Sequence, residues 1–119
     1  MEGTMDIKYT EYARLFSAIA DPNRLMILSV LTEGETFADN ILTHLDISQP
    51  TLSHHMKALC EAEIVVARKD GRRVFYSINE DMREKLLDNM LDILYKDDEG
   101  KAAVIAKRKA RRKTDIVLL

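Results

Sequence analysis

The stretch LDISQPTLSHHMKAL, residues 45–59, carries the strongest structural signal in this chain of 119 residues. Ser48 stands where a side-chain oxygen can cap a helix, and Pro50 is tolerated in a first helical turn. Apolar residues then recur on one helical face, namely Leu52, Met56 and Leu59. The stretch therefore predicts a tight turn followed by a helix over residues 48–60, the second half of a helix-turn-helix.

Three helices are predicted before this turn. The first has apolar residues at helical spacing, namely Tyr9, Tyr12, Ala13, Phe16, Ile19 and Ala20. Asp21 is a suitable N-cap and Pro22 a suitable first residue for the second helix, which is apolar on most of its circumference and therefore expected inside the core. Gly34 is predicted to end it. Thr36 with Asp39 predicts a capping box for a short third helix. Its inward residues would be Phe37, Ile41, Leu42 and Leu45.

A β-hairpin is predicted over residues 65–78. Asp70-Gly71 stands between β-branched and aromatic runs, and glycine accepts the positive φ that tight hairpin turns require. Helical spacing resumes over residues 79–96, with acidic residues near its N-terminal end, and Gly100 is predicted to end this helix. These elements together predict a mainly α (α+β) fold, a winged helix-turn-helix with a two-stranded wing and terminal dimerisation helices.

Composition and charge restrict the class of protein. Hydrophobic residues make up 46% of the chain and charged residues 32%, the balance of one globular protein. No apolar run approaches the roughly 20 residues of a membrane span, no leader is recognisable, and a single cysteine fits a reducing, cytoplasmic setting. We expect residues 1–100 to form the winged helix-turn-helix and dimerisation domain, and residues 101–119 a basic, helical C-terminal extension. The net charge of −2 argues by itself against nucleic-acid binding, so the distribution of charge decides.

His54, His55 and the only cysteine, Cys60, raise the question of a metal or catalytic site. A metal needs convergent donors, usually three or four, but these side chains diverge around a helix. His44 in the preceding helix does not repair that divergence. Cys60 and His55 lie about 140° apart around the helix, and no oxyanion element stands nearby. We therefore predict no metal, no cofactor and no enzymatic activity, with Cys60 a semi-buried hydrophobic residue.

The polar side of the helix over residues 48–60 suits DNA. Short hydroxyls, an amide, an imidazole and a lysine near a helix N-terminus can read base edges and bind phosphates. A solvated surface would have the same composition, but the neighbouring hairpin adds four cations within six residues. Arginines at a hairpin tip can enter a minor groove or bind phosphates, whereas the helix would lie in the major groove. The predicted DNA-binding residues are Ser48, Gln49, Thr51, Ser53, His54 and Lys57 in the helix and Arg68, Lys69, Arg72 and Arg73 in the wing.

Three motifs, in this order and spacing, resemble one known family. They are AIADPNRLMIL (residues 18–28), LDISQPTLSHHMKAL (45–59) and RKDGRRVFYSI (68–78). They are similar to the arsenic-repressor (ArsR/SmtB) family of bacterial winged-helix regulators, and the resemblance covers roughly residues 9–95. It implies a homodimeric repressor whose terminal helices form the dimer interface and whose inducer lowers its affinity for an operator.

The chain departs from the sensing motifs of that family. Metal sensors of the family often carry Cys-x-Cys before the recognition helix, where this chain reads TFADNILTHL (36–45). Others use aspartate and histidine on the helix after the wing, which here offers Asp88 and Asp92 but no histidine. Dithiol sensors need two cysteines, and this chain has one. An inducer, if a small molecule serves as one, is therefore not expected to be a metal bound at the usual family sites.

A homodimer is also predicted from apolar residues that a small monomer cannot cover. They are Tyr9, Tyr12 and Phe16 at one end of the chain and Leu87, Met90, Leu91 and Leu94 at the other. A two-fold dimer predicts an imperfect palindrome in double-stranded DNA, with half-sites about one helical turn apart. The alternative is a winged-helix module that binds protein, for which a solvated polar surface would suffice. Such a module has no need of Arg72 and Arg73 together.

The final segment, KAAVIAKRKARRK at residues 101–113, carries seven basic residues and no acid. Alanine, lysine and arginine favour a helix. The segment either folds back on the acidic helix after the wing, in its own or the partner subunit, or acts as a mobile basic arm that attracts DNA. The apolar IVLL at residues 116–119 favours docking, because it would otherwise stand in water.

Overall fold

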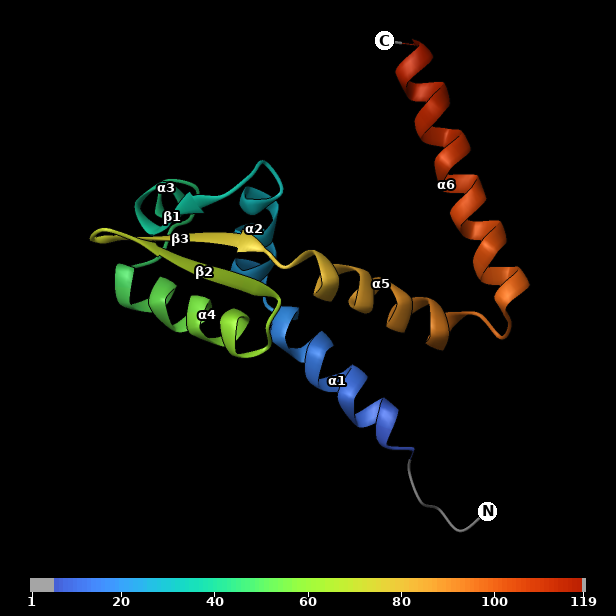
Figure 1. The fold of residues 1–119 in the computed structure, drawn as a ribbon, viewed down its shortest axis with the longest axis horizontal. Coiled ribbons are helices and arrows are strands. Elements are labelled where there is room, and N and C mark those ends of the chain that lie inside the picture. Colours follow the sequence, from blue (N-terminus) through green and yellow to red (C-terminus); the bar gives the residue numbers. More distant parts are fainter. Residues whose placement is uncertain (1–5, 119) are drawn as a thin grey trace. The chain divides into compact units, whose positions relative to one another are not determined.

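The computed structural model describes the backbone of residues 6–118 and the side chains of residues 6–112 (Figure 1). Backbone contacts divide the chain after Leu86 into two compact units. The elements are α1 (Ile7–Ile19), α2 (Pro22–Leu31), β1 (Thr36–Phe37), α3 (Ala38–Leu42), α4 (Gln49–Glu61), β2 (Val65–Asp70), β3 (Arg73–Ile78), α5 (Glu80–Leu94) and α6 (Asp98–Leu118). The predicted winged helix-turn-helix is confirmed.

Local capping signals place the starts of α2 and α4 as the sequence predicted. Asp21 caps α2 by accepting hydrogen bonds from the backbone amides of Asn23 and Arg24, at 2.8 and 3.2 Å. Ser48 caps α4 in the same way. Each interaction satisfies an amide that the first helical turn leaves without a partner. The second helix of the helix-turn-helix is therefore positioned by residues in its own first turn.

The core of the first unit lies where α2, α3, α4 and β2 meet. Its buried residues are Ile27, Leu31, Ile41, Leu52, Met56, Leu59, Ala62, Ile64 and Val65. The three predicted inward residues of α4 are among them, at 3% exposure or less. Burial of this stripe fixes the rotation of α4 about its axis, because the apolar side has to face the core.

Burial in the two N-terminal helices follows contacts that their apolar spacing did not specify. α2 is not covered all round, because Leu25 and Met26 are about half exposed. In α1 the fully buried residue is Leu15, which was not among the apolar residues whose helical spacing predicted this helix. Tyr9, which was predicted to lie in the dimer interface, is 47% exposed in the single chain. Apolar spacing shows that a helix has an apolar side but not whether the core or another surface covers it.

A third strand completes the sheet, which the sequence had predicted as a two-stranded hairpin. β1 pairs antiparallel with β3, with Thr36 opposite Tyr76 and Phe37 opposite Phe75, so the strand order is β1-β3-β2. The predicted capping box at Thr36 is therefore wrong, because Thr36 lies in β1 and Phe37 occupies the N-cap position of α3 without a side-chain hydrogen bond. A two-residue strand is too short to show the alternation that identifies a strand in sequence.

The break between the last two helices lies earlier than predicted. α5 ends at Leu94 and α6 begins at Asp98, so Gly100 lies in the first turn of α6 and does not end the preceding helix. Asp97 caps α6, since its Oδ1 accepts a hydrogen bond from the backbone amide of Gly100 at 2.7 Å. The apolar side chains of residues 116–119, on which the predicted docking depended, lie outside the described residues.

None of the helices in the described part of the chain combines the length and the apolar character that crossing a membrane requires.

Candidate nucleic-acid interface

The exposed side of α4 carries the helical residues that were predicted to contact DNA. Ser48, Gln49, Thr51, Ser53, His54 and Lys57 are all exposed. Because the opposite side of α4 is buried, these polar side chains face solvent together. Figure 1 shows α4 alongside the β2–β3 hairpin, within the same unit of the chain. The predicted helix and wing residues are thus presented on neighbouring elements.

The hydroxyl groups of Ser48 and Thr51, at the start of α4, are hydrogen-bonded to one another. The Oγ of Ser48 accepts a hydrogen bond from the backbone amide of Thr51 at 3.3 Å and lies 2.9 Å from Thr51 Oγ1. At the other end of the polar row, Lys57 Nζ lies 4.0 Å from Glu61 Oε1. That pair is exposed and long, so it restrains Lys57 little. The hydroxyl of Ser48 is therefore used to cap the helix, whereas the ammonium group of Lys57 is free to bind another anion.

The adjacent histidines have different environments. His54 is exposed, whereas His55 is buried and retains only 8% exposure. Arg24 Nε donates a hydrogen bond to His55 Nδ1 at 3.0 Å, and Arg24 Nη1 donates to the carbonyl of Ala18 at 3.2 Å. Because a guanidinium only donates, Nδ1 must accept, and the proton of neutral His55 then lies on Nε2, 4.0 Å from Asp21 Oδ1. His55 therefore joins α4 to α2 and to the end of α1.

Sequence reasoning missed Arg24 as the partner of His55. The available signal was that Arg24 is the only charged residue in the sequence of α2. A cation in a helix that packs into a core needs a polar partner there. The sequence does not say which of many polar residues that partner is, because 31 positions separate Arg24 from His55.

Cys60 is partly buried, in agreement with the predicted semi-buried position. Burial raises the pKa of its thiol, so less of the reactive thiolate is present at neutral pH. Within the described residues, no three His, Cys, Asp or Glu side chains gather closely enough to hold a metal ion. The expectation that the protein binds no metal stays a prediction, supported by the separation of these donors.

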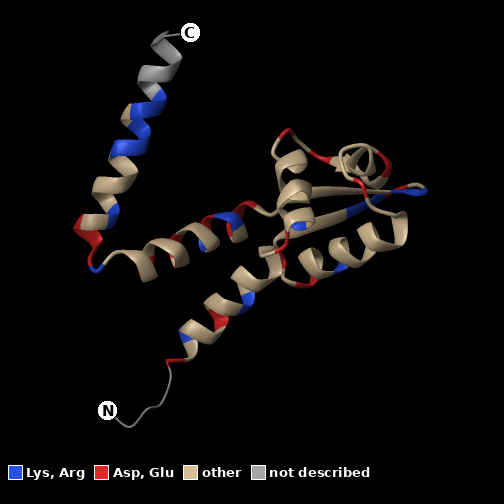
Figure 2. Ribbon diagram, turned by 180° about the vertical axis from the view of Figure 1, so that it is seen from behind, with Lys and Arg blue, Asp and Glu red and all other residues tan. Residues whose placement is uncertain are grey.

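The wing turns one residue later than its sequence suggested. Asp70 pairs with Arg73, so Gly71 and Arg72 form the tip, and Gly71 has φ 63°. Arg72 and Lys69 are exposed and have no side-chain hydrogen bond or ion pair within the described residues. Figure 2 shows the concentration of Lys and Arg at this tip. Arg72 is therefore an exposed, unpaired cation at the tip of the wing.

The other two wing arginines already have partners in the segment that leads into α3. Arg68 forms a bidentate ion pair with Glu35, in which Nε and Nη2 donate hydrogen bonds at 3.1 and 2.7 Å. This hydrogen-bonded pairing raises the pKa of Arg68 and lowers the pKa of Glu35. The guanidinium of Arg73 stacks on the ring of Phe37, with Cζ 4.1 Å from the ring centroid. These contacts join the wing, close to its tip, to the segment that leads into α3, and they leave Arg72 and Lys69 as its unpaired cations among the described residues.

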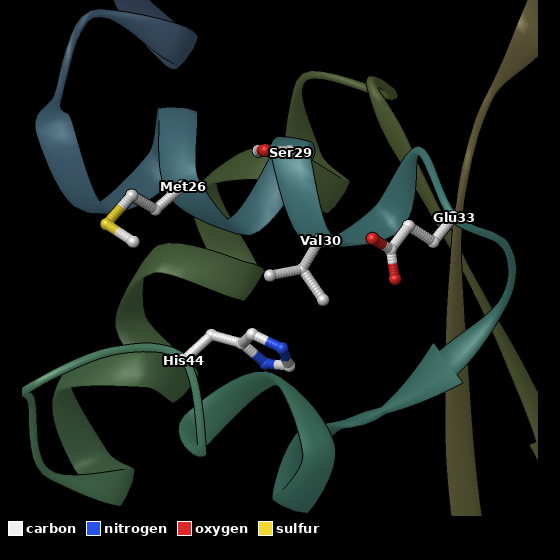
Figure 3. Close-up of a pocket in the computed structure, with 5 residues that line it drawn as sticks. All are labelled: Met26, Ser29, Val30, Glu33 and His44. Atoms are coloured by element: carbon white, nitrogen blue, oxygen red, sulfur yellow. The ribbon is translucent and has the colours of Figure 1, made fainter.

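A shallow pocket of about 170 Å³ lies between α2 and the end of α3 (Figure 3). Its lining residues are Met26, Ser29, Val30, Glu33 and His44. His44 Nδ1 lies 3.0 Å from the carbonyl of Asn40, which leaves the other ring nitrogen as the polar group that the imidazole can offer. Glu33 and His44 alone are too few donors for a protein metal site.

Apolar side chains are also exposed in both units. On α1 these are Ile7 and Tyr9, and on the part of α5 in the second unit they are Leu87, Met90, Ile93 and Leu94. The rings of Tyr9, Tyr12 and Phe16 form a row along α1, with centroids 6.0 and 6.4 Å apart. Contiguous exposed apolar side chains of this kind mark interaction surfaces. Four of the seven residues predicted to form a dimer interface are exposed, namely Tyr9, Leu87, Met90 and Leu94, whereas Tyr12 and Phe16 are half-buried.

The chain is similar to known transcriptional regulators. The sequence pattern described as "Bacterial regulatory protein, arsR family" matches residues 21–66. The arsenical resistance operon repressor of Staphylococcus xylosus is 41% identical, over 79% of this chain and 89% of that protein. The transcriptional repressor SdpR of Bacillus subtilis is 36% identical, over 71% of this chain and 93% of that protein.

Solved structures agree with these sequence similarities. One is the homodimeric winged helix-turn-helix DNA-binding domain of a possible ArsR-family transcriptional regulator from Mycobacterium bovis, which is 30% identical to this chain. The similarity covers 82% of this chain and 99% of that domain, with a TM-score of 0.58.

Proposed function

Because the chain belongs to the ArsR family of bacterial regulatory proteins, we propose that it is a homodimeric transcriptional repressor of an operator in double-stranded DNA. The observation that carries the proposal is the exposed polar row of α4. The opposite, apolar side of this helix is buried in the core, and the basic hairpin lies beside the helix. A rigid helix with one polar side is the element that a major groove accepts. The dimer then places two such helices on an imperfect palindrome.

In this proposal the residues of α4 have distinct roles. Thr51 and His54 read base edges, because a hydroxyl and an imidazole both donate and accept hydrogen bonds. Lys57 contacts phosphate, and Ser48 both caps the helix and fixes the hydroxyl of Thr51. His55 is a supporting residue that holds α4 against α2. Gln49 and Ser53 complete the row that faces the duplex.

The wing in this proposal contacts the flanking backbone or the minor groove through Arg72 and Lys69. Arg68 is oriented by Glu35 and stacks over Phe75, with Cζ 5.0 Å from the ring centroid. Arg73 is similarly held by Phe37. Arg68 and Arg73 thus stiffen the hairpin and add charge, and Arg72 at the tip supplies the most direct contact.

The inducer, in this proposal, is not a metal held by several thiolates, because each chain has one cysteine. Candidate inducers, metals and thiol reagents among them, are best compared by how much each one lowers the affinity of the protein for the operator. An inducer that binds the free repressor more tightly than the DNA complex lowers operator affinity by the same factor.

Replacing His54 or Thr51 by alanine should relax base preference while leaving the fold intact, because both side chains are exposed. The operator is first obtained by selecting bound duplexes from random DNA. Each lost base contact should cost roughly 1–3 kcal/mol at its position, about 5- to 150-fold in affinity. Binding to a random duplex is the control. Equal losses on selected and random duplexes would show that these residues contact only phosphate, and a failure to select any duplex would favour the protein-binding module.

Replacing Arg72 and Arg73 together by alanine should weaken binding to all duplexes and flatten its salt dependence. Each lost phosphate contact should remove about one unit from the slope of log affinity against log salt. The matched control is Arg83→Ala with Lys85→Ala, which removes two exposed cations of α5. If both double variants change the slope equally, or if neither variant changes it, the wing does not contact the DNA.

A further inference from the structure

Five cations lie together on α6, and we refer to them as the basic segment. They are Lys107, Arg108, Lys109, Arg111 and Arg112. All five are exposed, and none has a side-chain hydrogen bond or ion pair with the described residues of its own unit, 87–112. Figure 2 shows them as an almost continuous band of Lys and Arg along α6. No acidic residue occurs between Lys101 and Thr114.

Lys101, in the same helix, differs from the basic segment because it is paired with carboxylates of this unit. Its Nζ lies 3.3 Å from Asp92 Oδ1 and 3.7 Å from Asp98 Oδ1, and these carboxylates raise its pKa. The first turn of α6 is thus joined to α5, and the acids that approach α6 there are already used by Lys101. The basic segment begins almost two turns further along the helix, where the described residues of this unit provide no such partner.

The arrangement of the basic segment around the helix suits a broad anionic partner. At 3.6 residues per turn, its five positions cover about 200° of the circumference. A single carboxylate can neutralise one or two of these cations, whereas a phosphodiester backbone presents a charge about every 1.7 Å of duplex axis. Lysine and arginine both bind phosphate, and the segment contains no amide or hydroxyl side chain for reading bases.

The distribution of charge along the chain points to the same partner. Eleven of the eighteen Lys and Arg, but nineteen of the twenty Asp and Glu, lie in residues 1–100, so that part carries a net charge of −8. Residues 101–119 carry a net charge of +6. A body that is acidic on average and binds DNA through a small basic wing is repelled by the rest of the duplex. A concentrated positive segment offsets that repulsion.

From these observations we infer that the basic segment of α6 is a second DNA contact, which binds the phosphate backbone beside the operator without reading sequence. The inference rests on the proposed DNA-binding function and adds a contact site to it. It differs from the docked tail that the sequence favoured. The terminal apolar residues that suggested docking lie outside the described side chains, whereas the basic segment is exposed.

The test uses the full chain with all five cations replaced by glutamine, which retains a high helix propensity. Affinity is measured against salt on two duplexes, the selected operator alone and the same operator with about ten extra base pairs on each side. α6 has 21 residues and is therefore about 30 Å long, comparable to that extension. On the longer duplex we expect at least a ten-fold loss of affinity and a slope shallower by roughly 2–9 units, for two to ten lost phosphate contacts per dimer. On the short operator the loss should be clearly smaller.

A matched pair of double variants separates the position of the charges from their number. Lys107→Gln with Lys109→Gln should reduce the slope on the longer duplex, whereas Lys85→Gln with Lys96→Gln, both exposed on or just after α5, should leave it nearly unchanged. Equal effects of the two pairs would overturn the inference. Wild-type protein that selects no operator at all would instead contradict the proposed function.

A five-fold variant that keeps its salt slope but loses stability would show that α6 binds protein instead of DNA. If the variant keeps the wild-type salt slope on the longer duplex but unfolds at a lower temperature, or dissociates more readily into protomers, the basic segment binds acidic residues of a subunit. That outcome would overturn the DNA contact and restore the docked tail.

Discussion

Replacing Leu94 by aspartate is expected to raise the dissociation constant of the homodimer by roughly 100-fold or more. Leu94 is 64% exposed in the single chain and lies on α5 with three other exposed apolar residues, Leu87, Met90 and Ile93. Burying a leucine contributes roughly 1.5–3 kcal/mol, and two-fold symmetry counts each residue twice. The loss of about 3–6 kcal/mol corresponds to roughly a 100- to 20,000-fold weaker dimer.

Sedimentation equilibrium at several protomer concentrations measures this change. Because Leu94 is exposed in the single chain, the substitution should leave the fold of the protomer intact. Leu25→Asp is the matched control, since Leu25 is a leucine of α2 with 52% exposure and is not part of the predicted interface. Operator binding should weaken together with dimerisation. A wild-type protein that sediments as a monomer at micromolar concentration, or equal effects of the two variants, would contradict the proposed interface.

Replacing Leu59 by alanine should lower the free energy of unfolding by about 2–5 kcal/mol. Leu59 is fully buried on the inward side of α4, so its truncation removes apolar contacts and leaves a cavity between α4 and the core. This is a large part of the 5–15 kcal/mol that typically separates folded from unfolded protein. The same change loosens the support of the proposed recognition helix.

Urea unfolding, followed at one protomer concentration, measures the effect as a lower midpoint with an unchanged slope. Leu59→Met is the control, because it keeps the volume and should cost less than about 1.5 kcal/mol. A similar loss for the two variants would mean that hydrophobic volume at this position is not what stabilises α4.

Local signals in the sequence were sufficient for several elements. Asp21 before Pro22 located the start of α2, and Ser48 located the start of α4, because a cap acts on amides within the next three residues. The spacing of Leu52, Met56 and Leu59 identified the buried side of α4 and, with it, the opposite polar row that forms the candidate interface. Glycine in a short polar segment identified the wing, although its tip lies one residue later.

Other features depend on residues that meet only when the chain is folded. β1 exists because Thr36 and Phe37 find β3, and two residues carry no periodicity of their own. The side of α1 that holds Leu15 became buried through contacts that spacing within α1 does not specify. In each case the helix or strand propensity was local, but the partner was distant.

The candidate site divides in the same way. The sequence alone determined that α4 has an exposed polar row and that the wing is basic, because residue type and period are local properties. Only the tertiary structure decided that His55 is held by Arg24, and that Arg68 is occupied by Glu35, 33 positions away in sequence, while Arg72 stays unpaired. Side chains of the same type differ in availability because each pairing depends on which distant polar groups the fold brings within hydrogen-bond distance.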